Sequence, residues 1–185
     1  MTAYQEIIDF WFDEKIKPFW FNSTDDFDLS LRERYYDVYH AAKNSDGNSE
    51  LNLWANDALG ALALVIILDQ FPLNMFRGLP QSFETEALSR EIAKEAISKN
   101  FDADLTDEQK AFLYMPYMHS ENISDQDESL ILFNQQGLET NLRFAKHHHG
   151  IIKQFGRFPH RNKILGRLSS ELELEYLNSN NAFLG

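Results

Sequence analysis

Polar side chains that could do acid–base chemistry or hold an anion gather in three short segments of the sequence. In the first, residues 68–78, Asp69 and Gln70 close the most apolar stretch of the chain, and Arg77 follows within one turn-like excursion. A carboxylate in such a place is costly unless it is paired. An Asp69–Arg77 clamp that holds the loop is therefore as good an interpretation as a role in binding or catalysis.

The second segment, residues 114–126, contains His119 and Glu121. If one helix continues past Pro116, these two side chains point apart and cannot be adjacent metal ligands. A break at Ser120 would change that geometry. Because a lone histidine on a helix is more often a satisfied core residue than a ligand, metal binding stays a minor alternative, and no metal site is predicted.

The third segment, residues 148–167, alternates aromatic, glycine, proline and arginine residues. Its two glycines allow unusual backbone angles, and Pro159 prevents a helix from continuing. We expect an ordered loop, packed by its phenylalanines, that presents arginine forks suited to carboxylate or phosphate. The polar side chains that we expect this loop to present are Arg157, His160, Arg161, Asn162 and Arg167.

Charge is distributed unevenly along the chain. The net charge is −12, from 17 basic and 29 acidic residues, yet residues 141–170 contain seven basic residues and no acidic one. This acid-free window either docks against the acidic remainder of the chain or forms an anion site, and docking is favoured for most of it because acidic partners are abundant. Nucleic-acid binding is not expected, since duplex-binding domains are normally basic. The basic residues of the window are Arg143, Lys146, Lys153, Arg157, Arg161, Lys163 and Arg167.

Length and composition limit the other possibilities. A chain of 185 residues that is 43% hydrophobic predicts one domain, residues 1–185, with a real core. The absence of cysteine excludes disulfides, thiolate metal sites and cysteine nucleophiles. No glycine-rich phosphate loop is present, so no cofactor is predicted. The apolar run 58–68 falls short of the about 20 residues of a membrane span, and with no signal-like N-terminal stretch we expect a cytoplasmic protein that binds no membrane.

Helices must position the three segments, since apolar residues recur at helical spacing and no strand pattern is visible. The pattern predicts seven to nine helices, in a compact array or a solenoid-like stack. A loop is expected at 44–49. The expected helices cover residues 4–12, 24–43, 51–70, 82–99, 107–116, 125–145, 147–155 and 170–177. Ser23 is the expected N-cap of the second helix, and Pro72 follows the end of the third. A capping box at Thr106 is expected to start the helix that reaches Pro116.

The strings LALVIILDQFPLNMFRG, FLYMPYMHSENISDQ and IIKQFGRFPHRNKILGRLSS resemble the domain of unknown function 924 (DUF924) family of bacterial proteins, over nearly the whole chain. The resemblance implies an all-α fold with a tetratricopeptide-repeat-like (TPR-like) α-α superhelix, and it implies no activity. Two positions depart from the family's pattern, Leu73 and Asn122. Motif matching places the family's polar positions on Asp69, Gln70, Asn74, Arg77, His119, Ser120, Glu121, Asp125, Gln126, Arg157, His160, Arg161, Asn162 and Arg167.

Three functions fit these residues, and whether the protein is an enzyme stays open. The leading prediction is a helical binding protein whose Arg/His/Asp pocket takes an anionic small molecule or peptide. A hydrolase-type enzyme is the alternative, with His119 as general base and Glu121 or Asp69 as the acid or orienting group. A TPR-like scaffold for a protein partner is the third. The predicted binding residues are Gln70, Arg77, Gln126, Arg157, His160, Arg161, Asn162 and Arg167.

Overall fold

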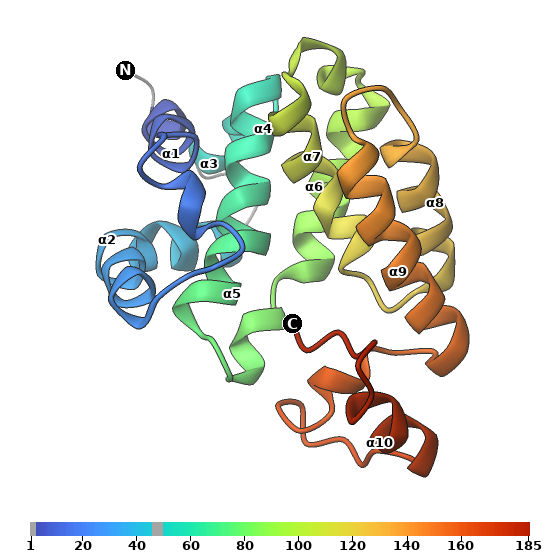
Figure 1. Ribbon diagram of the computed structural model, residues 1–185. Helices are drawn as coiled ribbons and strands as arrows, with labels where there is room; N and C mark the ends of the chain where they lie inside the picture. The colour runs from blue at the N-terminus through green and yellow to red at the C-terminus, as the bar shows by residue number, and fades with distance from the viewer. Residues whose placement is uncertain (1–2, 46–49) are drawn as a thin grey trace. The chain divides into compact units, whose positions relative to one another are not determined.

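A computed structural model describes residues 3–45 and 50–185, and within these residues the chain forms helices and turns with no strand (Figure 1). The all-α prediction is therefore confirmed. The chain divides into two compact units, Met1–Arg77 with Gln81–Pro116 and Gly78–Pro80 with Tyr117–Gly185. The single domain and the TPR-like superhelix stay predictions.

The first unit is built around aromatic side chains. Helix α1 packs on α4, α2 on α5, and α4 on α6. Trp11, Phe71 and Phe112 are fully buried where these helices meet, whereas Phe21 is 75% exposed. The helices of this unit are α1 (Ala3–Trp11), α2 (Asp25–Lys43), α3 (Glu50–Trp54), α4 (Ala58–Val65), α5 (Phe71–Met75) and α6 (Glu86–Ser98), and α7 (Asp107–Met118) begins here.

The expected helix over 51–70 is wrong in its bounds. It breaks between α3 and α4, where the side chain of Asp57 caps α4 by accepting from the backbone N–H of Gly60 at 2.9 Å. A Cβ on Gly60 would overlap the backbone of Trp54, so only glycine allows this close approach. Further on, a π-helical turn (Ile66–Gln70) joins α4 to α5, and Pro72 lies in the first turn of α5, where its missing N–H is tolerated.

The segment Ala58–Met75 is a core helix, as the apolar run predicts. Its length and mean hydropathy of 1.7 would suit a membrane span, but 83% of it is buried inside the protein.

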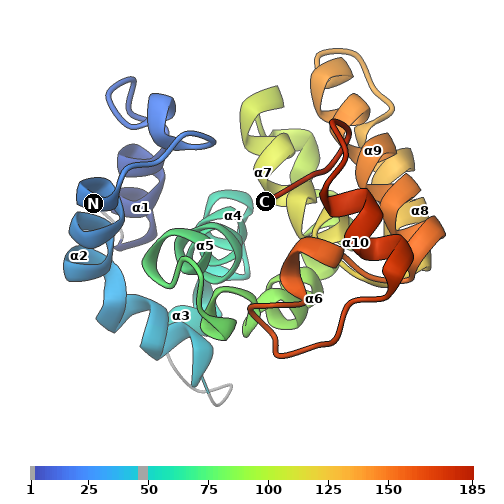
Figure 2. The ribbon, with the colours of Figure 1, turned by 60° about the horizontal axis from the view of Figure 1, so that its bottom comes forward.

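The second unit contains α8 (Ile123–Phe133), α9 (Glu139–Phe155) and α10 (Glu171–Leu177). Helices α8 and α9 run side by side (Figures 1 and 2). The predicted helices 125–145 and 147–155 are therefore wrong in their bounds, because the chain turns at residues 134–138, where Gly137 has a φ of 90°. Helix α9 then continues unbroken through His147.

Capping explains several helix boundaries. The N-cap of α2 is Thr24, whose hydroxyl accepts from Phe27 N–H at 3.3 Å, rather than the predicted Ser23. The predicted capping box of Thr106 is confirmed, and α7 continues through Pro116. Helix α6 starts at Glu86, after a short 3₁₀ turn, instead of at 82. The predicted loop 44–49 lies for the most part outside the described residues.

Candidate functional site

In the first segment, Arg77 forms an ion pair with Asp28, a residue that the sequence analysis did not identify as a candidate. Arg77 Nε donates to Asp28 Oδ2 at 2.7 Å, and Asn74 Nδ2 donates to Asp28 Oδ1 at 2.7 Å. The expected Asp69–Arg77 clamp is wrong, since the acid comes from α2. Burial alone would raise the pKa of Asp28, but the hydrogen bonds from Arg77, Ser23 and Asn74 outweigh it and hold the pKa below its usual value.

Asp69 and Gln70 lie in the π-helical turn and are buried, 1% and 5% exposed. The amide of Gln70 donates to Asp69 Oδ2 at 2.6 Å. Inserted π-turns often occur at functional sites. Contact of these two side chains with an outside ligand stays a prediction.

In the second unit, Glu121 ties the second segment to the third. Arg167 Nη1 and Nη2 donate to its two carboxylate oxygens at 2.6 and 2.9 Å, and Phe158 N–H donates to Oε1 at 2.8 Å. Burial alone would raise the pKa of Glu121, but these donors lower it below its usual value. Arg167 also donates from Nε to Asn162 Oδ1 at 3.0 Å. Its fork is therefore occupied by groups of the chain itself.

The fork of Arg157 is occupied in the same way. Its Nε and Nη2 donate to the two oxygens of Glu173 at 2.6 and 2.8 Å, and Nη2 also reaches the carbonyl of Leu168 at 2.9 Å. The hydrogen bonds from Arg157 lower the pKa of Glu173 to about 2. Docking of the acid-free window on the chain's own acids is thus observed for Arg157 and Arg167.

Histidines and aromatic rings form a compact cluster in the same unit. The ring of Phe183 lies 4.5 Å from that of His148 and 5.1 Å from that of His160. Burial, as the main cause, lowers the pKa of His148 to about 3 and that of His160 to about 4, and nearby His119 and Arg161 add to it. Both rings are neutral at neutral pH, so neither contributes positive charge to an anion.

Two further predicted residues are enclosed by the protein. Gln126 is fully buried and donates to the carbonyls of Met118 and Ser120, each at 2.7 Å, which fixes the turn between α7 and α8. Arg161 is 5% exposed, and its guanidinium carbon lies 4.6 Å from the ring centre of Phe158.

The geometry gives the hydrolase alternative no specific support. His119 follows the end of α7 and interacts electrostatically with His148 and His160. Glu121, however, is held ionised by Arg167 and is a poor proton donor. Among residues 3–45 and 50–185 no group of three or more His, Asp or Glu side chains could hold a metal ion.

Helix α9 carries a basic face that the site prediction missed. Arg143, Lys146 and Lys153 are exposed, and within the described part of the chain none of them makes an ion pair. With Gly150 they follow the spacing three, four, three, which places them on one side of a helix. The buried residues of α9, such as Ile152, lie on the opposite side. This set of four residues is called the α9 basic face below.

The spacing of residues 143, 146, 150 and 153 is visible in the sequence and could have predicted this face. The predicted helix break at residue 146 divided it between two helices. Since the true break is at 134–138, the four positions share one helix.

Comparison with known proteins gives a family and a fold. A family model for bacterial proteins of unknown function (DUF924) matches residues 7–181. A solved structure, that of the protein of unknown function ATU0120 from Agrobacterium tumefaciens, is 36% identical, with a TM-score of 0.87 over 95% of this chain and 96% of that chain. Among curated proteins no significant match was found.

Proposed function

This chain belongs to the bacterial DUF924 family, and we propose that it is a binding protein whose α9 basic face takes an acidic peptide segment of a protein partner. One observation carries the proposal. In the acid-free window Arg157 and Arg167 are bound by carboxylates of the chain, whereas Arg143, Lys146 and Lys153 are exposed, make no ion pair with a described residue and line one face of α9.

The charge of the face favours an anionic partner of limited length. From Arg143 to Lys153 the helix rises about 15 Å, the length of a few helical turns. Exposed ion pairs contribute roughly 0.5 kcal/mol each, so these three cations supply about 1.5 kcal/mol, near a tenfold gain in affinity. That contribution weakens as salt screens it.

Gly150 lies within the α9 basic face. Glycine inside a helix costs about 1 kcal/mol relative to alanine. Apart from the chain neighbours and backbone of α9 itself, no described atom lies within 4 Å of the position that a Cβ of Gly150 would occupy, so packing within the protein does not require a glycine there. In the proposed complex the missing side chain lets the partner's backbone approach α9 closely.

A peptide suits the face better than a nucleic acid. A nucleic acid presents an extended row of phosphates, and its affinity depends on many basic contacts. Outside residues 141–170 this chain carries 10 basic and 29 acidic residues, which repel such a polyanion. A short acidic segment can contact the α9 basic face alone.

The test is a binding titration with a fluorescein-labelled helical peptide of glutamate and alanine, followed by fluorescence anisotropy. We expect the variant Arg143→Gln/Lys146→Gln/Lys153→Gln to bind about tenfold more weakly than the unchanged protein at low salt. The matched control is Lys15→Gln/Lys94→Gln/Lys163→Gln, which removes the same charge from exposed positions elsewhere and includes one residue of the acid-free window.

Equal loss in the control would show that net charge, and not the α9 basic face, sets the affinity. An oligonucleotide of equal charge that binds as tightly as the peptide would show that the partner class is wrong.

A further inference from the structure

Two exposed isoleucines lie on α8, the helix that runs beside α9. Ile123 is 42% exposed and Ile131 is 69% exposed. They are eight positions apart in the sequence, so about 12 Å of helix separates them. Isolated exposed apolar residues are common on protein surfaces, so the meaning of these two depends on what lies next to them. They are called the α8 isoleucine pair below.

One contact between the two helices fixes their register. Asp127 Oδ1 on α8 lies 2.9 Å from His149 Nε2 on α9. The helices lie side by side and, because the short turn at 134–138 joins them, they run antiparallel (Figure 1). One turn forward along α8 and one turn back along α9 from this contact, Ile131 is therefore level with Lys146.

The same register holds at the other end of the α8 isoleucine pair. Ile123 lies one turn before Asp127 on α8, and Lys153 lies one turn after His149 on α9. Each isoleucine is thus level with one lysine of the α9 basic face. Gly150 lies between these two levels, at the middle of the face.

Both helices direct these residues away from the core of the second unit. On α8 the buried side chains are those of Gln126, Ser129 and Phe133. At about 3.6 residues per turn, Ile131 lies opposite to them, and Ile123 lies on the flank of α8 that is next to α9. The α9 basic face is likewise opposite to the buried side of α9. The α8 isoleucine pair and the cations of α9 therefore adjoin on one outward surface.

The acidic residues of α8 leave this surface open to an anionic partner. Asp127, on the flank next to α9, is paired with His149. Asp125 and Glu128 lie toward the other flank of α8, and Asp125 accepts from Ser120 Oγ at 2.6 Å. An anionic group over α9 therefore meets cations, while the adjoining part of α8 offers apolar contact.

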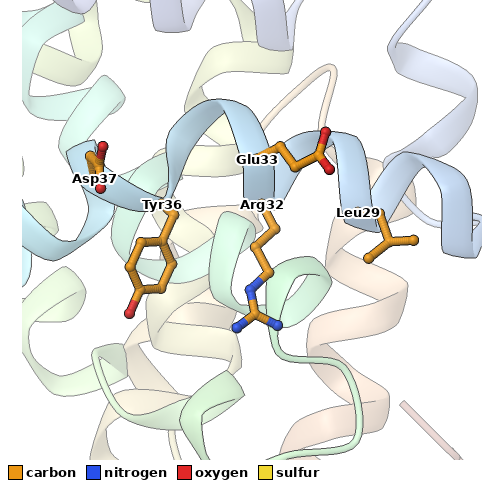
Figure 3. A pocket seen from close by; sticks show the side chains of 5 residues that line it. All are labelled: Leu29, Arg32, Glu33, Tyr36 and Asp37. Atoms are coloured by element: carbon orange, nitrogen blue, oxygen red, sulfur yellow. The ribbon is translucent and has the colours of Figure 1, made fainter.

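The outer surface of α2, in the first unit, lacks this arrangement. An open hollow there is lined by Leu29, Arg32, Glu33, Tyr36 and Asp37. Figure 3 shows the guanidinium of Arg32 on the other side of α2 from the carboxylates of Glu33 and Asp37. The charged groups of α2 therefore do not act together on one ligand.

We propose that the partner segment bound by the α9 basic face is an amphipathic helix, acidic along one side and apolar along the adjoining side. Its carboxylates contact the cations of α9, and two of its apolar residues, about two turns apart, pack on Ile123 and Ile131. Gly150 lies where the backbone of the partner helix comes closest to α9. This inference rests on the proposed function and adds to it the conformation of the partner and its apolar contacts.

An anionic membrane surface also combines negative charge with apolar groups. Two features favour the helix. The net charge of −12 opposes the approach of the whole chain to an anionic bilayer. The α8 isoleucine pair offers two separate apolar side chains, which match the repeat of a helix better than they match the continuous apolar face that inserts into lipid.

The test compares two fluorescein-labelled helical peptides of equal charge by fluorescence anisotropy. One is the glutamate–alanine peptide, and in the other two alanines, seven positions apart on one side, are replaced by leucine. We expect the leucine peptide to bind about tenfold more tightly, because its leucines bury apolar surface against α8. This gain should persist at high salt, which screens the contribution of the charges.

The variant Ile123→Ser/Ile131→Ser should remove the gain from leucine and leave the affinity for the glutamate–alanine peptide unchanged. The matched control is Leu172→Ser/Leu174→Ser, which removes two exposed apolar side chains from α10 in the same unit and should keep the gain. Equal thermal unfolding midpoints establish that both variants fold.

The inference is overturned if leucine gives no gain, or if the control variant loses the gain as well. It is also overturned if Ile123→Ser/Ile131→Ser abolishes binding to phosphatidylserine vesicles, or abolishes a dimer seen by sedimentation, since a membrane or a second copy would then cover the surface. Failure of the proposed function looks different. In that case Arg143→Gln/Lys146→Gln/Lys153→Gln binds both peptides as tightly as the unchanged protein does.

Discussion

Arg157 and Arg167 were predicted to bind an outside anion, but both bind carboxylates of the chain itself. Arginine forks match carboxylates wherever these come from. Here the carboxylates are Glu173 and Glu121 of the same chain, and the surrounding backbone supplies further partners. The affinity of these arginines for anions was predictable, but the identity of the anion required the three-dimensional contacts.

At this scale, Arg157→Met should lower the free energy of unfolding, because it leaves the carboxylate of Glu173 without its cation. The side chain of Glu173 is only 3% exposed. Urea unfolding followed by circular dichroism measures the loss. Arg157→Met/Glu173→Met should recover most of it, since no charge is then stranded. A double variant as unstable as the single one would contradict this account of the pair.

Helix α9 shows what an element adds to its residues. Its start at Glu139, after the turn at 134–138, leaves one unbroken helix, which directs His148 and Ile152 into the unit and the α9 basic face outward. Helical periodicity gave the existence and approximate number of helices. The break at 134–138 was missed, although the polar run at 134–137, which ends in Gly137, is a turn signal.

Gly150→Ala separates binding from stability within this element. Removing an interior helical glycine should raise the free energy of unfolding by about 0.5–1 kcal/mol, since no neighbour resists the added methyl group. If the partner's backbone approaches here, the same change should weaken peptide binding. Thermal unfolding and anisotropy on one preparation provide both values. If Gly150→Ala raises the free energy of unfolding but leaves the peptide affinity unchanged, the partner's backbone does not approach α9 closely at Gly150.

The helices around Asp69 mark another limit of prediction from sequence. Its burial at the end of an apolar helix could be inferred from the pattern. The π-helical turn and the partner of Arg77 could not, because Asp28 lies 49 residues away from Arg77 in the sequence. Contacts between distant segments carry no local pattern.

For the whole molecule, the buried histidines make stability depend on pH. His148 and His160 have folded pKa values of about 3 and about 4, against an ordinary 6.5. The unfolded chain therefore takes up protons first as the pH falls. The stability that comes from keeping these two histidines neutral is fully present above pH 6.5. It is lost as the pH falls from 6.5 toward 3, at up to about 1.4 kcal/mol per pH unit for each histidine.

Chemical denaturation at a series of pH values measures this slope. His148→Phe should make the slope between pH 6 and pH 4 shallower by roughly one proton. An unchanged slope would show that His148 does not stay neutral in the folded protein.

The central claim is that Arg157 and Arg167 stabilise the fold while the α9 basic face binds a partner. The most direct measurement determines unfolding free energy and peptide affinity together for Arg167→Met and for Arg143→Gln/Lys146→Gln/Lys153→Gln. We predict that Arg167→Met lowers the free energy of unfolding by about 3 kcal/mol, while the folded variant binds the glutamate–alanine peptide normally. The triple variant should have the same free energy of unfolding as the unchanged protein and should bind the peptide about tenfold more weakly. A folded Arg167→Met protein that fails to bind, together with a triple variant that binds normally, would contradict the account.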